Sequence, residues 1–337
     1  MVSSWSTARR WLALAWTLVA VPLLVHCQGP SATTEPTGGE THFLQRCQEN
    51  GVDCGTELAC ICGVCTLPCD EQASCGDLQA ASCVAANSAE KCEGFQAQGH
   101  CDLECQLDTD CASATPLCDA GVCRPTSLVP TCSKSGVTAN QVLVIGDSFF
   151  ALSHQITAYL EELARDAGVL PAGERYRDNS SLLDNALALD GNGIEAQYTD
   201  GKAEADVKVV VMSGGGADVL LGSCEDPLTA DCPLLVNAVL AAEQLLARMA
   251  EDGVDDVVFA YYPDPTDQGL REKVDTLRPL LQAACADHPT RCHWVDLRRA
   301  FTGHPDYLVD GINPSAAGSR ASAAEIWSAM RHSCVAQ

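Results

Sequence analysis

The chain of 337 residues is long enough for a processed leader and about two folded units. Its 45 acidic residues outnumber its 20 lysines and arginines, and a net charge of −25 repels phosphate backbones and anionic lipid head groups. We therefore expect no nucleic-acid partner.

The first segment has the features of an export signal. Arg9 and Arg10 form a basic region ahead of an apolar run from Trp11 to Val25. This run is shorter than the roughly 20 apolar residues of a membrane-spanning helix, and a stretch rich in Ser, Thr, Pro and Gly follows it. We expect residues 1–26 to be a signal peptide that is removed.

The four residues that end at Cys27, Leu-Val-His-Cys, resemble a bacterial lipobox, with His26 where a small residue is usual. The resemblance implies that Cys27 carries a lipid and that residues 27–46 form a flexible tether. The protein would then belong to the cell envelope, at the outer membrane or in the periplasm, and touch the membrane only through this lipid. An ordinary secreted protein and an uncleaved anchor are the alternatives.

The number of cysteines also favours export. Of the 21 cysteines, 20 remain when Cys27 is set aside as a lipid carrier, which allows complete pairing. Fifteen fall between Cys47 and Cys132, where aromatic residues are few and no apolar periodicity is sustained. We expect residues 47–132 to form a small domain held together by disulfides in place of a large apolar core.

Two parts of this domain are similar in sequence. The segment from Asp53 to Cys65 is echoed by the segment from Asp110 to Cys123, and both end in Gly-Val-Cys. This similarity indicates two related modules, whose protein partners the sequence does not reveal. A zinc ion or an iron–sulfur cluster is the alternative for four closely spaced cysteines, Cys60, Cys62, Cys65 and Cys69. The export signal favours disulfides, so we expect no metal and no other cofactor.

After Cys132, short β-branched runs alternate with amphipathic segments. The expected strands are Val142–Ile145, Arg175–Asp178, Val207–Met212, Asp256–Tyr262 and His293–Leu297. One expected helix has an apolar face made by Leu235, Val239, Ala242, Leu246 and Met249. The alternation predicts a three-layer α/β/α domain over residues 141–334. Its flavodoxin-like, doubly wound parallel sheet would bind ligands at the carboxyl ends of the strands.

The first of these strands breaks at Gly146-Asp147-Ser148 and enters a helix. Ser148 would therefore lie at the carboxyl end of a strand and beside a helix N-terminus, where free amide hydrogens favour developing negative charge. The structural alternative is that Ser148 only caps the helix.

Two further motifs follow in order: Gly-Gly-Gly-Ala-Asp at 214–218, directly after the third expected strand, and Asp-Gly-Ile-Asn-Pro at 310–314, before the last expected helix. Together with Gly-Asp-Ser they resemble the sequence blocks of the SGNH/GDSL hydrolases, over roughly residues 141–334. The resemblance implies the fold given above and an ester hydrolase activity.

The site residues that this resemblance implies are carried over by position. Ser148 stands at the nucleophile and Asp310 at the residue that orients the base. Gly215 matches the glycine of the third block, and the backbone amide of Ser181 is the candidate donor from the second block.

Two positions depart from the family. Ala217 stands where the family has an asparagine that donates to the oxyanion, and the loss of such a donor typically lowers turnover by about 10²–10³. Asn313 stands where the family has its histidine, and a carboxamide is not basic at neutral pH. The standard catalytic triad is therefore absent.

His304 is the candidate surrogate base, because it follows the fifth expected strand and precedes Asp310. We expect His154 and His293 to be surface or structural histidines. For Asp147 and Asp218, helix capping and loop ordering are favoured over acid–base roles.

Cys132, the last cysteine of the Cys-rich region, and the five cysteines that follow it remain to be paired. Cys224 and Cys232 flank one loop, Cys285 and Cys292 flank a helix-to-strand turn, and the simplest partner of Cys334 is Cys132. We expect these three pairs to be disulfides, although sequence does not fix connectivity.

Two functions fit these features. The first is an exported ester hydrolase that acts through Ser148 on an acyl or acetyl ester, such as an O-acetylated glycan or a lipid. The second is a catalytically weak or inactive binding protein of the cell envelope that holds a carbohydrate or acyl ligand. The family resemblance favours the first, and the missing histidine favours the second.

Overall fold

The computed structural model describes residues 136–337 apart from 184, 189–191 and 225–226, together with short stretches nearer the N-terminus. These stretches are 43–45, 47, 54, 58–61, 64–69, 75–76, 78, 81–85, 99–105, 108–111, 116–119, 121–124 and 131–133. The expected signal peptide and Cys27 lie outside the described residues.

The larger domain is built on a five-stranded sheet in which all neighbours are parallel. The strands are β8 (Val142–Ile145), β9 (Arg177–Asp178), β10 (Val209–Met212), β11 (Asp256–Tyr261) and β12 (Arg291–Asp296). Their spatial order is β12-β11-β10-β8-β9, so the order reverses between β8 and β10. This is the flavodoxin-like, doubly wound arrangement, and the predicted fold class is confirmed.

β8 has the expected bounds, and the other strands differ from the expected ones by one or two residues at an end. β9 is limited to the two residues that pair with β8 at the edge of the sheet. β12 begins at Arg291, before the expected His293, because Arg291 and Cys292 already pair with β11. The hydrogen-bonded register, which a hydropathy pattern does not contain, sets these ends.

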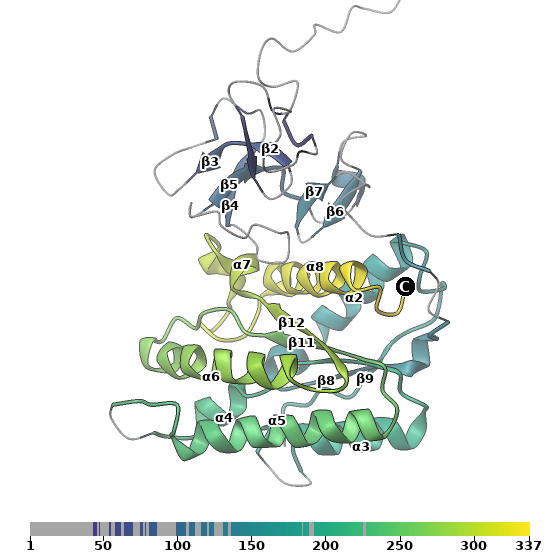
Figure 1. The fold of residues 1–337 in the computed structure, drawn as a ribbon, viewed down its shortest axis with the longest axis vertical. Coiled ribbons are helices and arrows are strands. Elements are labelled where there is room, and N and C mark those ends of the chain that lie inside the picture. The colour runs from purple at the N-terminus through teal and green to yellow at the C-terminus, as the bar shows by residue number, and fades with distance from the viewer. Residues whose placement is uncertain are drawn as a thin grey trace, which may run out of the picture. The chain divides into compact units, whose positions relative to one another are not determined.

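Helices cover both faces of the sheet (Figure 1). They are α1 (Ser148–Ala151), α2 (Gln155–Asp166), α3 (Ile194–Glu204), α4 (Gly216–Leu221), α5 (Pro233–Glu251), α6 (Gln268–Ala286), α7 (Arg298–Phe301) and α8 (Ala316–His332). α2 and α8 pack together on one face, and α3, α5 and α6 lie on the other. The result is the expected three-layer domain.

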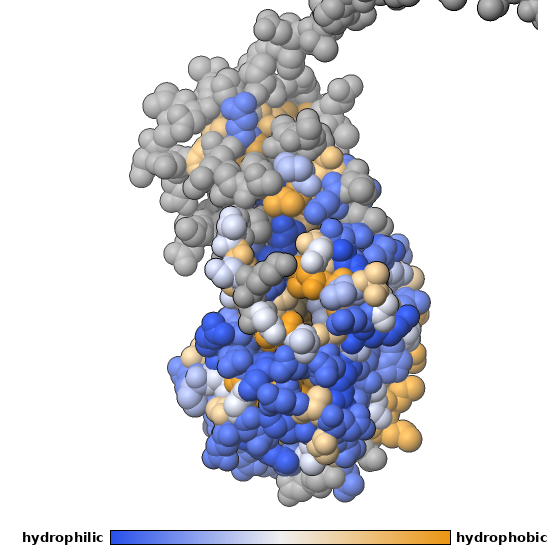
Figure 2. Space-filling model, turned by 90° about the vertical axis from the view of Figure 1, so that its right-hand side faces the viewer, coloured by the Kyte–Doolittle hydropathy of each residue, from blue (hydrophilic) through white to orange (hydrophobic). Residues whose placement is uncertain are grey.

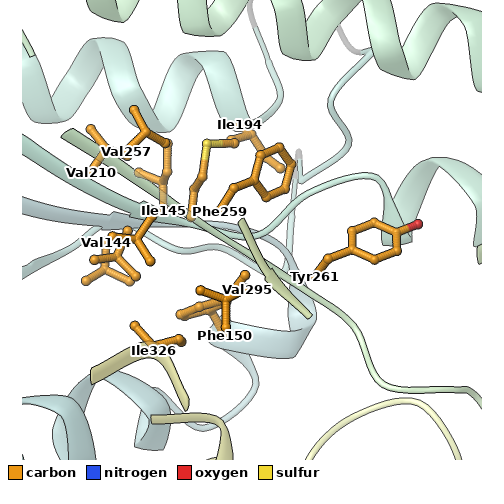
Figure 3. Close-up of a cluster of buried hydrophobic side chains, with 14 of the residues drawn as sticks. Val144, Ile145, Phe150, Ile194, Val210, Val257, Phe259, Tyr261, Val295 and Ile326 are labelled. Carbon is orange, nitrogen blue, oxygen red and sulfur yellow. The ribbon is translucent and has the colours of Figure 1, made fainter. Parts of the chain in front are cut away.

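The core lies on both sides of the sheet. Every residue of β8, β10 and β11 is buried, as expected for strands with helices on both faces. In Figure 3, Val144 points to the side of Phe150 and Ile326, whereas Val210 lies on the opposite side with Ile194. These two apolar layers hold the carboxyl ends of the strands in fixed positions.

The helix predicted from its apolar face is α5. Four of its five predicted contact residues are buried, while Val239 is only partly buried and Ala238 takes its place. The helix ends at Glu251, Asp252 is its C-cap, and Gly253 follows with φ = +78°. By length and composition α5 could also cross a membrane, but its buried stripe is typical of a core helix.

Two β-hairpins of the Cys-rich region share one disulfide pattern. The first is formed by β1 (Ala59–Ile61) and β2 (Val64–Thr66), and the second by β6 (Leu117–Asp119) and β7 (Val122–Arg124). Each hairpin carries two bonds to the segment before it, which are Cys47–Cys60 with Cys54–Cys65 and Cys105–Cys118 with Cys111–Cys123. A third sheet contains β3 (Pro68–Cys69), β4 (Ser82–Ala85) and β5 (Gly99–Asp102).

The disulfide interpretation holds wherever the structure describes both partners. Cys60, Cys65 and Cys69 all belong to disulfides, and Cys62 lies outside the described residues. The three pairs expected among the other six cysteines are confirmed as Cys132–Cys334, Cys224–Cys232 and Cys285–Cys292. So many disulfides fit an exported protein, because thiols are kept reduced in the cytosol.

Candidate active site

Ser148 lies where the chain leaves β8 and enters α1, at the reversal of strand order. The turn between them begins at Gly146, which has φ = +156°. A Cβ atom at this position would lie 2.4 Å from Oγ of Ser213, so the turn requires glycine. Ser148 itself is partly exposed, in contrast to its buried neighbours Asp147 and Phe149.

Gln197 of α3 fixes this turn with both ends of its amide. Its Oε1 accepts the N–H of Gly146 at 2.8 Å, and its Nε2 donates to the carbonyl of Gly146 at 3.0 Å. The N–H of Ser181 donates to the same carbonyl at 3.1 Å. The expectation of a free oxyanion donor at Ser181 is therefore wrong for this structure, because that carbonyl already engages the amide.

Asp147 organises the other side of the turn. Its carboxylate caps α1 by accepting the N–H of Phe149 at 3.1 Å, as predicted, and it also accepts the hydroxyl of Tyr262. The Ser213 hydroxyl donates to it at 3.4 Å. Burial raises the pKa of Asp147 above its ordinary value, although the hydrogen bond from Tyr262 opposes this change.

Tyr262 joins two of the sequence blocks. It follows β11, and its hydroxyl accepts the N–H of Gly216 at 3.1 Å while it donates to Asp147. Burial and the neighbouring carboxylate of Asp147 raise the pKa of Tyr262 well above its ordinary value, so the hydroxyl keeps its proton. The start of α4 is thereby held against the turn that carries Ser148.

A cavity of about 260 Å³ opens beside Ser148. Most of its lining is apolar, with Phe149, Ala217, Leu220, Leu270, Val274 and Ile312 among the residues. None of the described residues that line it is a histidine, lysine or arginine, and its one carboxylate is the buried Asp147. The cavity is therefore suited to a neutral, largely apolar group.

The third block supplies backbone to this cavity. Gly215 precedes α4 with φ = +95°, and Gly216 and Ala217 line the cavity. Ala217 presents a methyl group where the family resemblance places a donor. Asp218 faces away and accepts the N–H groups of Leu187 at 2.8 Å and of Ala188 at 2.9 Å, which is the predicted loop-ordering role.

Asp310 and Asn313 hydrogen-bond to each other in the loop whose Ile312 lines the cavity. The side-chain amide of Asn313 donates to Oδ2 of Asp310 at 2.8 Å, and its backbone N–H donates to Oδ1 at 2.6 Å. Partial burial raises the pKa of Asp310, but the hydrogen bonds from Asn313 and Ile312 outweigh this and hold it below its ordinary value. Oδ1 of Asn313 is buried without a hydrogen-bond partner among the described residues.

His304 does not meet Ser148 in this structure. It stacks on Tyr307, with the ring centroids 4.3 Å apart, and lines a different cavity of about 350 Å³ with Arg299 and Arg320. His304 directly precedes the short turn at Pro305–Tyr307, and it is not among the described residues that line the cavity beside Ser148. The surrogate-base hypothesis for His304 is not supported by this placement.

The two histidines that we expected to be structural, His154 and His293, each lie beside a carboxylate. His154 lies 3.0 Å from Asp178, and His293 lies 2.8 Å from Asp256. Ser180 approaches His154 at 3.2 Å, but through the same Nδ1 atom that faces Asp178, so these three residues do not form a relay. The structural interpretation of both histidines agrees with these contacts.

Sequence reasoning missed Gln197 and Tyr262. A tyrosine at the carboxyl end of an apolar strand was a usable signal for Tyr262, because that end of the sheet carries the site. No comparable signal marks Gln197, whose partner Gly146 lies 51 residues away in the sequence.

No family model and no curated protein matches this chain. Solved structures do resemble it. They include LAE5, an alpha/beta hydrolase enzyme from the metagenome of Lake Arreo, Spain, which is 19% identical with a TM-score of 0.45 over 59% of this chain and 99% of its own. The acetyl xylan esterase AlAXEase is 14% identical with a TM-score of 0.44 over 56% and 98%. A catalytic mutant of Axe2, an acetylxylan esterase from Geobacillus stearothermophilus, is 17% identical with a TM-score of 0.41 over 58% and 96%.

Proposed function

We propose that this protein is an exported hydrolase of acyl esters that uses Ser148 as its nucleophile and turns over slowly. The observation that carries the proposal is the position of Ser148, partly exposed at the reversal of strand order and facing a largely apolar cavity. Ligands of open α/β sheets bind at this place.

In the proposed reaction, Oγ of Ser148 attacks the ester carbonyl carbon and the alcohol leaves with a proton. Water then hydrolyses the acyl-serine and releases the acid. The described lining offers no imidazole to take the serine proton, and Asp147 is already occupied by hydrogen-bond donors. We expect solvent to accept the proton, which makes the first step slow.

The resemblance to SGNH/GDSL hydrolases supports the same assignment and the slow turnover that we propose. Asn313 stands at the family's histidine and Ala217 at its asparagine. Both replacements leave the fold around Ser148 in place and remove groups that stabilise the transition state.

A fluorophosphonate probe tests the nucleophile directly. The wild-type protein should become labelled slowly, and the Ser148→Ala variant should not be labelled. A Ser181→Ala variant is the matched control, because its hydroxyl accepts the N–H of Leu183 outside the cavity and its loss should leave labelling unchanged. Equal labelling of wild type and Ser148→Ala would contradict the proposal.

The second candidate is a binding protein that holds a carbohydrate or acyl ligand without converting it. The observation that favours it is the chemistry of the lining, in which no described residue is a base at neutral pH other than the occupied Asp147. Ligand binding together with no labelling of Ser148 would select this function over the first.

We also propose that the mature chain begins at Cys27 and carries a lipid there, with residues 27–46 as the tether. The leader and the even number of cysteines that remain support this proposal. Mass spectrometry of the N-terminal peptide tests it, and an unmodified Cys27 or cleavage elsewhere would make the protein an ordinary secreted one.

A further inference from the structure

The mouth of the cavity beside Ser148 is formed by leucines that are largely exposed to solvent. Leu182 is 51% exposed, Leu220 is 49% exposed and Leu221 is 80% exposed, and all three line the cavity. They come from two separate elements, the loop after β9 and the end of α4. Most of the described α/β surface seen in Figure 2 is hydrophilic, so a cluster of exposed leucines needs an explanation.

The apolar surface continues from this rim to the nucleophile. Leu270 and Val274 of α6 and Ile312 from the loop after Asp310 line the same cavity as Ser148. A chain that enters between the leucines of the rim therefore remains in contact with apolar side chains until it reaches the serine. The exposed leucines are placed to bury the outer part of such a chain.

The charges and hydrogen-bonding groups favour a neutral, apolar ligand. No lysine or arginine is among the described lining residues, so a phosphate or a free carboxylate finds no counter-ion there. Two of the polar lining groups are already engaged, because the hydroxyl of Tyr262 donates a hydrogen bond to the carboxylate of Asp147. A sugar ring would therefore leave most of its hydroxyl groups without partners.

We propose that this cavity binds the acyl chain of a neutral ester with a medium-length chain, which runs outward from Ser148 between Leu182 and the leucines of α4. The proposal rests on the proposed function for the position of the ester carbonyl at Ser148. The chain itself is held by apolar contact alone. Acetylated sugars are poorer ligands than acyl esters of about eight carbons.

Binding to the Ser148→Ala variant tests this without any need for turnover. The probes are 1-octanoylglycerol and 1-acetylglycerol, each kept below its micellar concentration and measured by titration calorimetry. Each methylene moved from water into an apolar site strengthens binding by a factor of about four, so the octanoyl ester should bind at least about 100-fold more tightly. Equal affinities, or tighter binding of an acetylated xylobiose, would overturn the proposal.

Two matched variants in the same background locate the effect. Leu220→Ser should weaken binding of the octanoyl ester about tenfold or more and leave the acetyl ester unchanged. Leu240→Ser is the control, because Leu240 is 48% exposed but lies on α5 outside the cavity lining. Equal losses from both variants would also overturn the proposal. Failure of fluorophosphonate labelling would count against the nucleophile and leave this binding result standing.

Discussion

The hydroxyl of Tyr262 donates to the buried carboxylate of Asp147 and accepts the N–H of Gly216 at 3.1 Å. One side chain thus connects the end of β11, the turn before Ser148 and the start of α4. Asp147 is 2% exposed, so water cannot readily replace this donor. The position of Ser148 depends on a polar network whose members Asp147 and Tyr262 also line the cavity.

The Tyr262→Phe variant should lower the free energy of unfolding by about 1–3 kcal/mol, because it removes one donor and one acceptor from buried partners. Urea unfolding monitored by circular dichroism measures the change. Tyr159→Phe is a suitable control, since Tyr159 is only partly buried beneath Arg320 and should change the free energy by less than about 0.5 kcal/mol. Similar losses in both variants would show that the hydrogen bonds of the Tyr262 hydroxyl do not stabilise the protein more than those of a partly buried tyrosine.

Asp147 should make stability fall as pH rises. Burial raises the pKa of Asp147 in the folded protein, so the unfolded chain ionises first. Its contribution to stability is complete below the ordinary pKa of about 3.9 and is lost as pH rises through the folded-state pKa. Relative to the Asp147→Asn variant, the wild-type protein should therefore lose free energy of unfolding as pH rises above about 4.

The contribution of Asp310 to stability should change with pH in the opposite direction, so Asp310→Asn serves as the comparison. Hydrogen bonds from Asn313 and Ile312 hold the pKa of Asp310 below its ordinary value, despite partial burial. Its contribution to stability is present above the ordinary pKa and is lost as pH falls through the folded-state pKa. Urea titrations at several pH values measure both differences, and parallel curves for Asp147→Asn and wild type would contradict the assignment.

The sheet could be predicted from the sequence because its central strands are apolar on both faces. The runs that became β10 and β11 carry this signal in every residue except Asp256 at the start of β11, and the order of the βα units left few possible topologies. Ser148 could be placed for the same reason, since it directly follows a strong strand signal.

The surroundings of Ser148 could not be predicted to the same extent. Whether Ser181 offers a free amide depends on the Gly146 carbonyl, which becomes available only when β8 and β9 lie side by side. The position of His304 depends on its stacking with Tyr307, and it lines a different cavity from Ser148, which chain order alone does not reveal. Side-chain contacts between distant segments decide these details, and no local pattern contains them.

The disulfides should contribute unequally to stability. In the chain-entropy treatment, Cys132–Cys334, with a sequence separation of 202, is worth about 5 kcal/mol, and Cys285–Cys292, with a separation of 7, about 2 kcal/mol. Paired serine substitutions at each bond, compared by urea unfolding, measure this order.

Thiol counting in the denatured, unreduced protein should find essentially no free thiol, and several reactive thiols would contradict the pairing.

The Asn313→His variant, combined with Ala217→Asn, should raise hydrolysis of aryl acetates in a Ser148-dependent way. Asn313 already donates to Asp310 at 2.8 Å, so a histidine there has a carboxylate partner for one ring nitrogen. Ala217 lines the cavity with Ser148, so an asparagine there can donate to the oxyanion. We expect kcat/KM to rise at least about tenfold, because a general base alone is worth about 10²–10⁴.

Adding Ser148→Ala to the double variant should abolish the gain, and each single variant should gain less than the pair, because groups that act as one unit are not additive. The comparison requires a folded double variant, which circular dichroism and its melting temperature establish. A folded double variant with no gain would mean that Ser148, Asp310 and position 313 are not arranged for acyl transfer, and the binding function would then replace hydrolysis. Fast turnover by wild type that is lost in His304→Ala would instead show that the loop around His304 moves to the cavity and supplies the base.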